Sequence, residues 1–172
     1  MNVNLFFLFL IAGLITMLVY FKPLKIKEQT FVNLPQLELK NFTYYELGLE
    51  GLKRVMKAEK SVVFSDKYEV YSIDYTDNLN DYKVNIHSDY ASYHKGKVLL
   101  NGNVEFNRED GFIFQTQSAI YDKKQNMLTI DKKYTSTRGK DSLSGSSLKY
   151  NDRLNKIQSS NVTIVYQLEE SF

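Results

Sequence analysis

The sequence predicts an all-β protein, a twisted antiparallel half-open β-jellyroll or sandwich, preceded by one N-terminal transmembrane helix. The composition supports strands, because the chain has 13 Tyr and 11 Phe but only 2 Pro and 8 Gly, and aromatic residues favour sheets. Apolar and polar residues alternate with a period of two, as in Tyr82, Val84 and Ile86, which gives each strand one apolar face. The third observation is a long apolar segment near the N-terminus.

This apolar segment covers residues 5–21, LFFLFLIAGLITMLVYF, and contains no charged residue. At about 1.5 Å per residue it reaches roughly 25 Å, the short end of what spans a bilayer. It continues into Lys22 and Pro23 without a small-residue cleavage site, so we expect a retained anchor over residues 1–22. The lysines that follow it would by charge alone place the remainder in the cytoplasm.

The remaining residues have room for one domain. Residues 23–40 contain both prolines and are expected to form a linker and first strand region. Residues 41–168 are expected to form the β-jellyroll domain. The alternation and the intervening polar residues predict strands at 42–48, 53–65, 68–75, 82–87, 98–106, 111–121, 127–135, 143–150 and 156–166.

Two of the predicted turns carry specific chemistry. The sequence His94-Lys95-Gly96-Lys97 supplies a glycine for positive φ, and residues 122–126 supply polar side chains that tolerate the left-handed conformation. Short turns between consecutive strands indicate a meander of hairpins.

The hairpins repeat along the chain. The segments ASYHKGKVLLNGNVEF at 91, AIYDKKQNMLTIDKKY at 119 and LKYNDRLNKIQSSNVTI at 148 align Tyr93, Tyr121 and Tyr150, which are 28 and 29 residues apart. A two-stranded hairpin cannot bury its own apolar face, so such units are expected to lie side by side and form a continuous hydrophobic interior. An open trough is the expected result.

Few residues are suited to catalysis or metal binding. The chain has no Cys and only two His, and His87 and His94 lack a metal-ligand spacing. Glu109 and Asp110 precede Gly111 in a predicted turn, and no nucleotide-binding or nucleophile-elbow motif is present. A net charge of +2 also disfavours nucleic acid. We therefore expect no enzyme, no cofactor and no metal site.

Large apolar residues stand out on the inward faces of the predicted strands. They have two interpretations, a closed sandwich core or a groove for an apolar ligand. The candidate groove residues are Val84, Ile86, Val104, Phe106, Phe112, Phe114, Leu128, Ile130, Val162 and Ile164.

The chain resembles the lipopolysaccharide-export proteins of the LptC family, which are related to the LptA and OstA repeat proteins. The similarity rests on the N-terminal anchor, on VLLNGNVEFNREDGFIFQTQSAIYDKKQNMLTI at 98–130, and on a second copy ending LKYNDRLNKI. Within the first copy, GNV at 102–104, DGFIFQT at 110–116 and AIYD at 119–122 match the family's repeat signature. The resemblance covers most of residues 40–166.

The resemblance implies a single-pass protein of the inner membrane, anchored by residues 5–21, with its β domain in the periplasm. It implies that the chain binds lipopolysaccharide in the groove, receives it from the subunits of an inner-membrane ABC transporter and passes it to a periplasmic bridge protein of the LptA type. The last predicted strand would then provide the partner edge, with residues Val162, Thr163, Ile164 and Tyr166. The alternative is a bitopic structural or assembly protein that has a packed interior and binds a partner by sheet-edge strand addition.

Overall fold

The computed structural model describes residues 34–49, 51–78 and 82–168 of the chain. The predicted transmembrane segment, residues 5–21, and most of the predicted linker lie outside these residues. Among the described residues, no helix has the length and apolar character needed to span a membrane.

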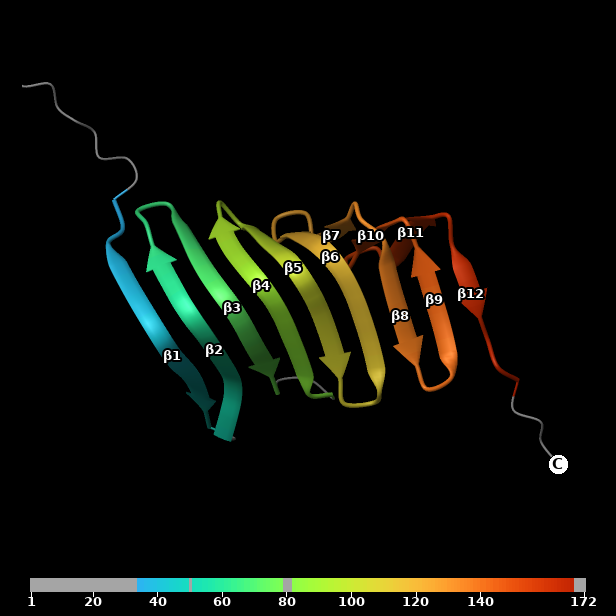
Figure 1. Ribbon diagram of the computed structural model, residues 1–172, viewed down its shortest axis with the longest axis horizontal. Coiled ribbons are helices and arrows are strands. Elements are labelled where there is room, and N and C mark those ends of the chain that lie inside the picture. The colour runs from blue at the N-terminus through green and yellow to red at the C-terminus, as the bar shows by residue number, and fades with distance from the viewer. Residues whose placement is uncertain (1–33, 50, 79–81, 169–172) are drawn as a thin grey trace, which may run out of the picture. The chain divides into compact units, whose positions relative to one another are not determined.

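The described residues form one antiparallel β-sheet, which confirms the predicted all-β class (Figure 1). The central strands follow one another in chain order, as a meander of hairpins requires. The strands are β1 (Leu37–Gly48), β2 (Gly51–Val63), β3 (Lys67–Asp77), β4 (Val84–His94), β5 (Lys97–Arg108), β6 (Phe112–Asp122), β7 (Met127–Ile130), β8 (Tyr134–Arg138), β9 (Asp141–Gly145), β10 (Ser147–Asn151), β11 (Lys156–Ser160) and β12 (Thr163–Val165).

The sheet divides into two branches at β6. Phe112–Thr116 of β6 pair with β8, whereas Ile120–Asp122 pair with β7. One branch continues as β8, β9 and β12, and the other as β7, β10 and β11. In Figure 1 the second branch lies behind the first.

The predictions of single strands at 127–135, 143–150 and 156–166 are therefore wrong. Each segment contains two short strands separated by a break, at 131–133, at Ser146 and at 161–162. A break of one to three residues leaves an apolar alternation on both sides, so the sequence pattern looks continuous. The three breaks lie at the same level of neighbouring strands, where the sheet turns from one branch to the other.

The same line continues across the longer strands as a series of irregularities, which we call the crease. The pairing register shifts between His87 and Tyr90 of β4 and between Asn101 and Val104 of β5. Bulges of this kind bend a strand and increase its twist. Residues with positive φ mark the crease in several strands, namely Asn41, Ser72, Gly102, Asn103 and Asn161.

In β2, β4 and β6, the inner residues that border the crease are small. Ala58 and Ser61 flank it in β2, Ser88 and Ala91 in β4, and Thr116 and Ala119 in β6, and all six are buried. Side chains farther from the crease are larger and less buried. The small side chains let the two halves of the bent sheet approach closely at the crease, while larger ones hold the halves apart farther out.

The core lies where the two halves meet. Val104, Ala119, Ile130, Tyr134 and Leu148 form one buried cluster, with residues from both sides of the crease. The Tyr134 hydroxyl also lies 2.8 Å from Ser159 Oγ, which joins β8 of one branch to β11 of the other. The Ser159 hydroxyl donates to the Ser147 carbonyl at 2.6 Å, so Tyr134 is the donor to Ser159. These contacts close the bent sheet into a jellyroll.

Both predicted turns are confirmed. Lys95 and Gly96 connect β4 to β5 with φ values of 49° and 88°, the two positive values that a type I′ hairpin requires. Asn126 ends the turn between β6 and β7 with a φ of 50°.

The crease predicts an unequal response to alanine at two glycines with similar φ. Gly102 has a φ of 77°, and a Cβ there would lie 2.5 Å from Asp89 Oδ2 and 2.9 Å from Asp89 Cβ. Gly111 has a φ of 84° with no atom within 4 Å of its Cβ position. Gly102→Ala should lower the free energy of unfolding by about 2–3 kcal/mol and Gly111→Ala by about 1 kcal/mol. Urea denaturation of the two variants measures the difference, and equal losses would show that the crease tolerates the added methyl group.

The link between the branches predicts a smaller effect. Tyr134→Phe removes the hydrogen bond to Ser159 without creating a cavity, and should cost about 0.5–1.5 kcal/mol of unfolding free energy. Tyr150→Phe is a matched control, because the Tyr150 hydroxyl bonds only to exposed groups of its own hairpin, Asp152 and Asn155. We expect the control to change stability by less than about 0.5 kcal/mol. Urea denaturation of both variants measures the two changes. An equal change in both would show that the hydrogen bond between Tyr134 and Ser159 does not stabilise the contact between the branches.

Candidate functional site: an apolar trough

Residues directly opposite each other on neighbouring strands have side chains on the same face of the sheet. The register therefore defines a row of inner side chains on one side of the crease, which we call the first row. It crosses the sheet from β1 to β12 and consists of Tyr44, Met56, Tyr75, Ile86, Phe106, Phe114, Ser136, Leu143 and Ile164.

A second row lies on the other side of the crease. It runs from β1 to β11 and consists of Leu37, Val63, Tyr68, Tyr93, Val98, Tyr121, Leu128, Tyr150 and Ile157. The three tyrosines that align the sequence repeats, at 93, 121 and 150, all belong to it. Members of both rows pack against the core cluster, including Phe114 and Leu143 from the first row and Leu128 and Tyr150 from the second. The two rows therefore line one interior.

The predicted groove residues fall on this interior in a regular order. Ile86, Phe106, Phe114 and Ile164 belong to the first row and Leu128 to the second. Val84 and Phe112 lie two residues farther from the crease than Ile86 and Phe114, on the same face. Val104 and Ile130 are core residues beside the crease. Val162 lies in the break before β12 and is 43% exposed.

Sequence reasoning missed a large part of the lining. The first-row residues Tyr44, Met56, Tyr75 and Leu143 were not predicted, nor was the tyrosine character of the second row. The alternation of Tyr68 and Val70 with Lys67 and Glu69 was a usable signal. It did not show that residues on two sides of a strand break face the same interior.

The interior is incompletely buried. Val104 and Ile130 are 5% and 1% exposed, whereas Tyr93 is 37% and Tyr68 50% exposed. The other predicted groove residues in β4–β7 are partly buried. Burial thus decreases with distance from the crease, which is the profile of a trough with a packed floor and an open mouth.

The outer side chains at the level of the first row are polar. Opposite residues there form the series Thr43, Lys57, Asp74, His87, Glu105, Gln115, Thr135, Ser144 and Thr163. Hydrogen bonds from Asn107 and Gln115 lower the pKa of Glu105, with Gln115 Nε2 at 2.7 Å from its carboxylate. At this level the inner side chains are apolar and the outer ones polar, whereas Tyr45, Ile113 and Val165 are exposed apolar residues elsewhere on the outer face.

The trough is open at both ends of the sheet. Within the described residues, β1 pairs only with β2, β11 only with β10 and β12 only with β9. Apolar side chains are exposed at these edges, as in Leu37 at 49%, Ile157 at 64% and Ile164 at 69%. The predicted partner edge retains this character, because Tyr166 is also 69% exposed.

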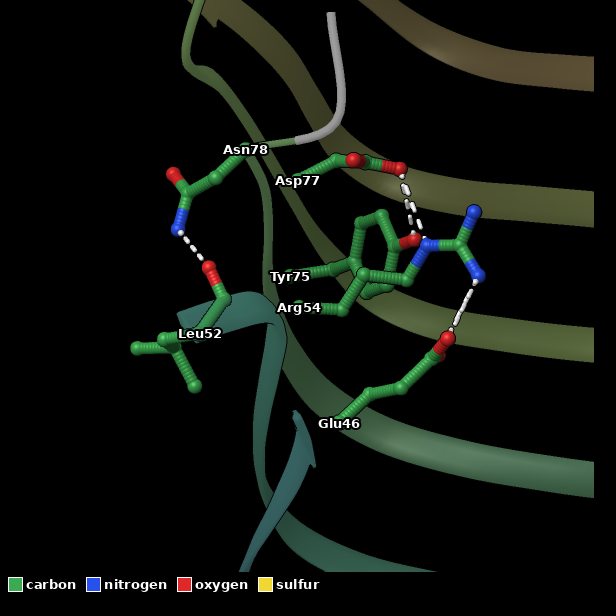
Figure 2. Close-up of polar contacts among 6 residues, drawn as sticks. All are labelled: Glu46, Leu52, Arg54, Tyr75, Asp77 and Asn78. Atoms are coloured by element: carbon green, nitrogen blue, oxygen red, sulfur yellow. Dashed lines mark hydrogen bonds and ion pairs between the residues drawn. The ribbon is translucent and has the colours of Figure 1, made fainter. Parts of the chain in front are cut away.

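On the side of the crease that carries the first row, charged side chains lie at the mouth of the trough, at the ends of β1, β2 and β3. Arg54 donates from Nε to Asp77 at 3.1 Å and from Nη1 to Glu46 at 3.1 Å, and the Tyr75 hydroxyl also donates to Asp77 at 3.1 Å (Figure 2). Burial, and then the bond to Asp77, raise the pKa of Tyr75 to about 12, so its phenol stays protonated. One arginine thus holds β1, β2 and β3 together at their ends.

A second ion cluster lies farther along the same mouth. Arg108 donates two hydrogen bonds of 2.7 Å to Asp110, and Arg138 Nη2 lies 3.1 Å from the same carboxylate. The hydrogen bonds from Arg108, above all, lower the pKa of Asp110 to about 2. Asp110 is therefore ionised throughout the physiological pH range and pairs with both arginines.

Metal-binding geometry is absent from residues 34–49, 51–78 and 82–168. No group of three or more His, Asp or Glu side chains among them could hold a metal ion. The chemically distinctive feature is the interior of the trough.

Comparison with known proteins identifies the family of the chain. No curated protein sequence matches the chain. Among solved structures, the chain is similar to LptH of Pseudomonas aeruginosa, the LptA-homologous periplasmic component of a lipopolysaccharide transport device, at 8% sequence identity and a TM-score of 0.41, over 77% of this chain and 94% of that chain. The family model described as "Lipopolysaccharide-assembly, LptC-related" matches residues 5–167. The match spans nearly the whole chain, and the chain therefore belongs to the LptC family of lipopolysaccharide-assembly proteins.

Proposed function

We propose that this chain binds the acyl chains of lipopolysaccharide in its trough and passes the lipid from an inner-membrane ABC transporter to a periplasmic bridge protein. One observation carries the proposal: the apolar inner face runs from β1 to the C-terminal strands and is left partly exposed. Membership of the lipopolysaccharide-assembly family supplies the identity of the lipid.

The trough meets a physical need of such a lipid. Each methylene exposed to water costs about 0.8 kcal/mol, so a single acyl chain of ordinary length costs on the order of 10 kcal/mol. Side chains such as Phe106 and Phe114 are themselves only partly buried. An acyl chain between the rows would remove apolar surface from water on both partners.

The open edges supply the route onward. An unpaired strand can add a strand from another sheet through main-chain hydrogen bonds, and the added sheet would extend the trough. The proposal assigns the C-terminal edge, with Val162, Thr163, Ile164 and Tyr166, to the bridge protein. The edge of β1 remains for the transporter.

The proposed setting is the inner membrane, with residues 5–21 as the anchor and the β domain in the periplasm. Energy for directional transfer would come from the transporter, and no catalytic role is assigned to this chain. This arrangement requires the domain to be exported despite the lysines that follow the apolar segment.

Photo-crosslinking tests the location of the lipid. A photo-reactive residue at Phe106 or Phe114, on opposite positions of β5 and β6, should capture lipopolysaccharide while the transporter hydrolyses ATP. The matched controls are Glu105 and Gln115, their neighbours in sequence, which are also opposite each other but on the outer face. We expect lipid adducts at least about tenfold more abundant at the inner positions. Equal labelling of both faces would contradict the trough proposal.

Proline substitution tests the partner edge. Successive residues of a strand direct their N–H groups to opposite sides, so one of Thr163→Pro and Ile164→Pro removes an outward donor and the other removes a bond to β9. Both should reduce capture of the bridge protein, by about tenfold or more, because proline also disfavours strand geometry. Co-purification with the transporter should be unchanged.

Thr163→Ser separates the backbone from the side chain, because it keeps the donor and removes only a methyl group from the polar face. It should bind the bridge protein as the parent does. If both proline variants are folded by circular dichroism and still retain the bridge protein at parental levels, the C-terminal edge is not the docking surface.

A further inference from the structure

The turns at one side of the trough's mouth form a basic line, which we call the basic rim. It comprises residues 65–67, 94–97, 122–126 and 151–156, which connect β2 to β3, β4 to β5, β6 to β7 and β10 to β11. The first three of these turns lie along the upper edge of the sheet in Figure 1. The rim has three acidic residues, Asp66, Asp122 and Asp152, and seven basic ones, Lys67, Lys95, Lys97, Lys123, Lys124, Arg153 and Lys156.

The opposite rim differs in charge. Its described residues in 77–84, 108–112 and 138–141 include four basic and four acidic side chains. Both of its arginines, Arg108 and Arg138, contact Asp110. On the basic rim, Lys67 is paired with Glu69 at 2.7 Å and Lys97 with Asp122 at 3.6 Å. The other rim cations, Lys95, Lys123, Lys124, Arg153 and Lys156, still give this side of the mouth the larger positive charge.

The basic rim directly borders the second row of apolar side chains. Tyr93 and Val98 are adjacent in sequence to the turn at 94–97, and Tyr121 and Leu128 flank the turn at 122–126. The Lys123 ammonium lies 5.1 Å from the centroid of the Tyr93 ring. A rim lysine therefore extends over an aromatic side chain of the trough lining.

Hydrogen bonds between neighbouring turns fix the rim. The Lys123 amide donates to the Gly96 carbonyl at 2.9 Å, and the Asp152 amide donates to the Asn126 carbonyl at 2.9 Å. Neighbouring turns are two strand spacings apart, or roughly 10 Å. The fold thus presents cationic groups at a regular interval along the mouth.

We propose that the basic rim binds the phosphate groups of the lipid whose acyl chains occupy the trough, so that the lipid lies with its head group on this side of the mouth. The inference rests on the proposed function and adds an orientation to it. Lysine is a point-charge ligand for phosphate, and a lipid with two phosphates contacts neighbouring turns at once.

The position of Lys123 favours a ligand inside the trough over contact with a membrane surface. Its ammonium lies above the lining, where it can reach the head group of a lipid whose chains descend between the rows. The cation over an aromatic ring also shields part of the tyrosine from water.

The test measures binding of two lipids to the full chain in detergent: a hexa-acylated disaccharide lipid with two phosphates, and the same lipid with both phosphates removed. The rim variant carries Lys95→Gln, Lys123→Gln and Lys124→Gln. The control variant carries Lys57→Gln, Lys132→Gln and Lys140→Gln, which remove the same charge from exposed positions away from the basic rim.

The parent should prefer the phosphorylated lipid, and this preference should decrease with added salt. The rim variant should bind the phosphorylated lipid about tenfold more weakly, as expected for the loss of three exposed charge contacts, and the dephosphorylated lipid as the parent does. The control variant should change binding of either lipid by less than about twofold.

Three outcomes would overturn the assignment. If parent and rim variant bind both lipids equally, the trough function stands and the rim has no part in it, whereas failure of the parent to bind either lipid removes the proposed function as well. If the rim substitutions leave lipid binding intact but abolish sedimentation with anionic phospholipid vesicles, the rim contacts a membrane surface instead.

Discussion

The crease is the constraint on which the rest of the structure depends. A single antiparallel sheet has two faces, and only by bending across its strands can one face enclose an interior. The bend needs backbone conformations that most residues avoid, and the chain places Gly102 and asparagines such as Asn103 and Asn161 there. Because the neighbouring strands bend at the same level, they remain paired by hydrogen bonds on both sides of the crease.

The gradient of side-chain size away from the crease determines what the interior can do. A closed sandwich would need large residues throughout, matched across the two halves to normal packing density. Here residues such as Ser88 and Ala91 let the halves touch at the floor, while Ile86 and Tyr93, two residues farther out, remain partly exposed. The floor and the hydrogen-bonded ladder hold the two halves together, and the upper interior is where we propose that the lipid binds.

The sequence was sufficient to predict the inner and outer faces of the strands but not the crease. Period-two alternation predicted which residues share a face, and it placed Phe106 and Phe114 correctly on the inner side. The crease was missed because a bulge adds one residue and switches the alternation without interrupting it, as in β4, where Ser88 and Ala91 are both buried on the inner side although they are three residues apart. For the same reason Val162 was assigned to a strand although it lies in a break. Asparagines at breaks, such as Asn103 and Asn161, were the available signal.

The bend also restricts what can dock at the edges. At the C-terminal edge, β11 and β12 are separate strands on two sides of a break, and β1 has a positive φ at Asn41 at the corresponding level. A flat strand can therefore pair with only half of either edge, whereas a strand bent at the same level can pair with all of it. This mismatch protects exposed edges against indiscriminate sheet growth. In the proposed transfer, it would also favour a bridge protein that has a crease of its own, since only such a partner continues both rows of the trough.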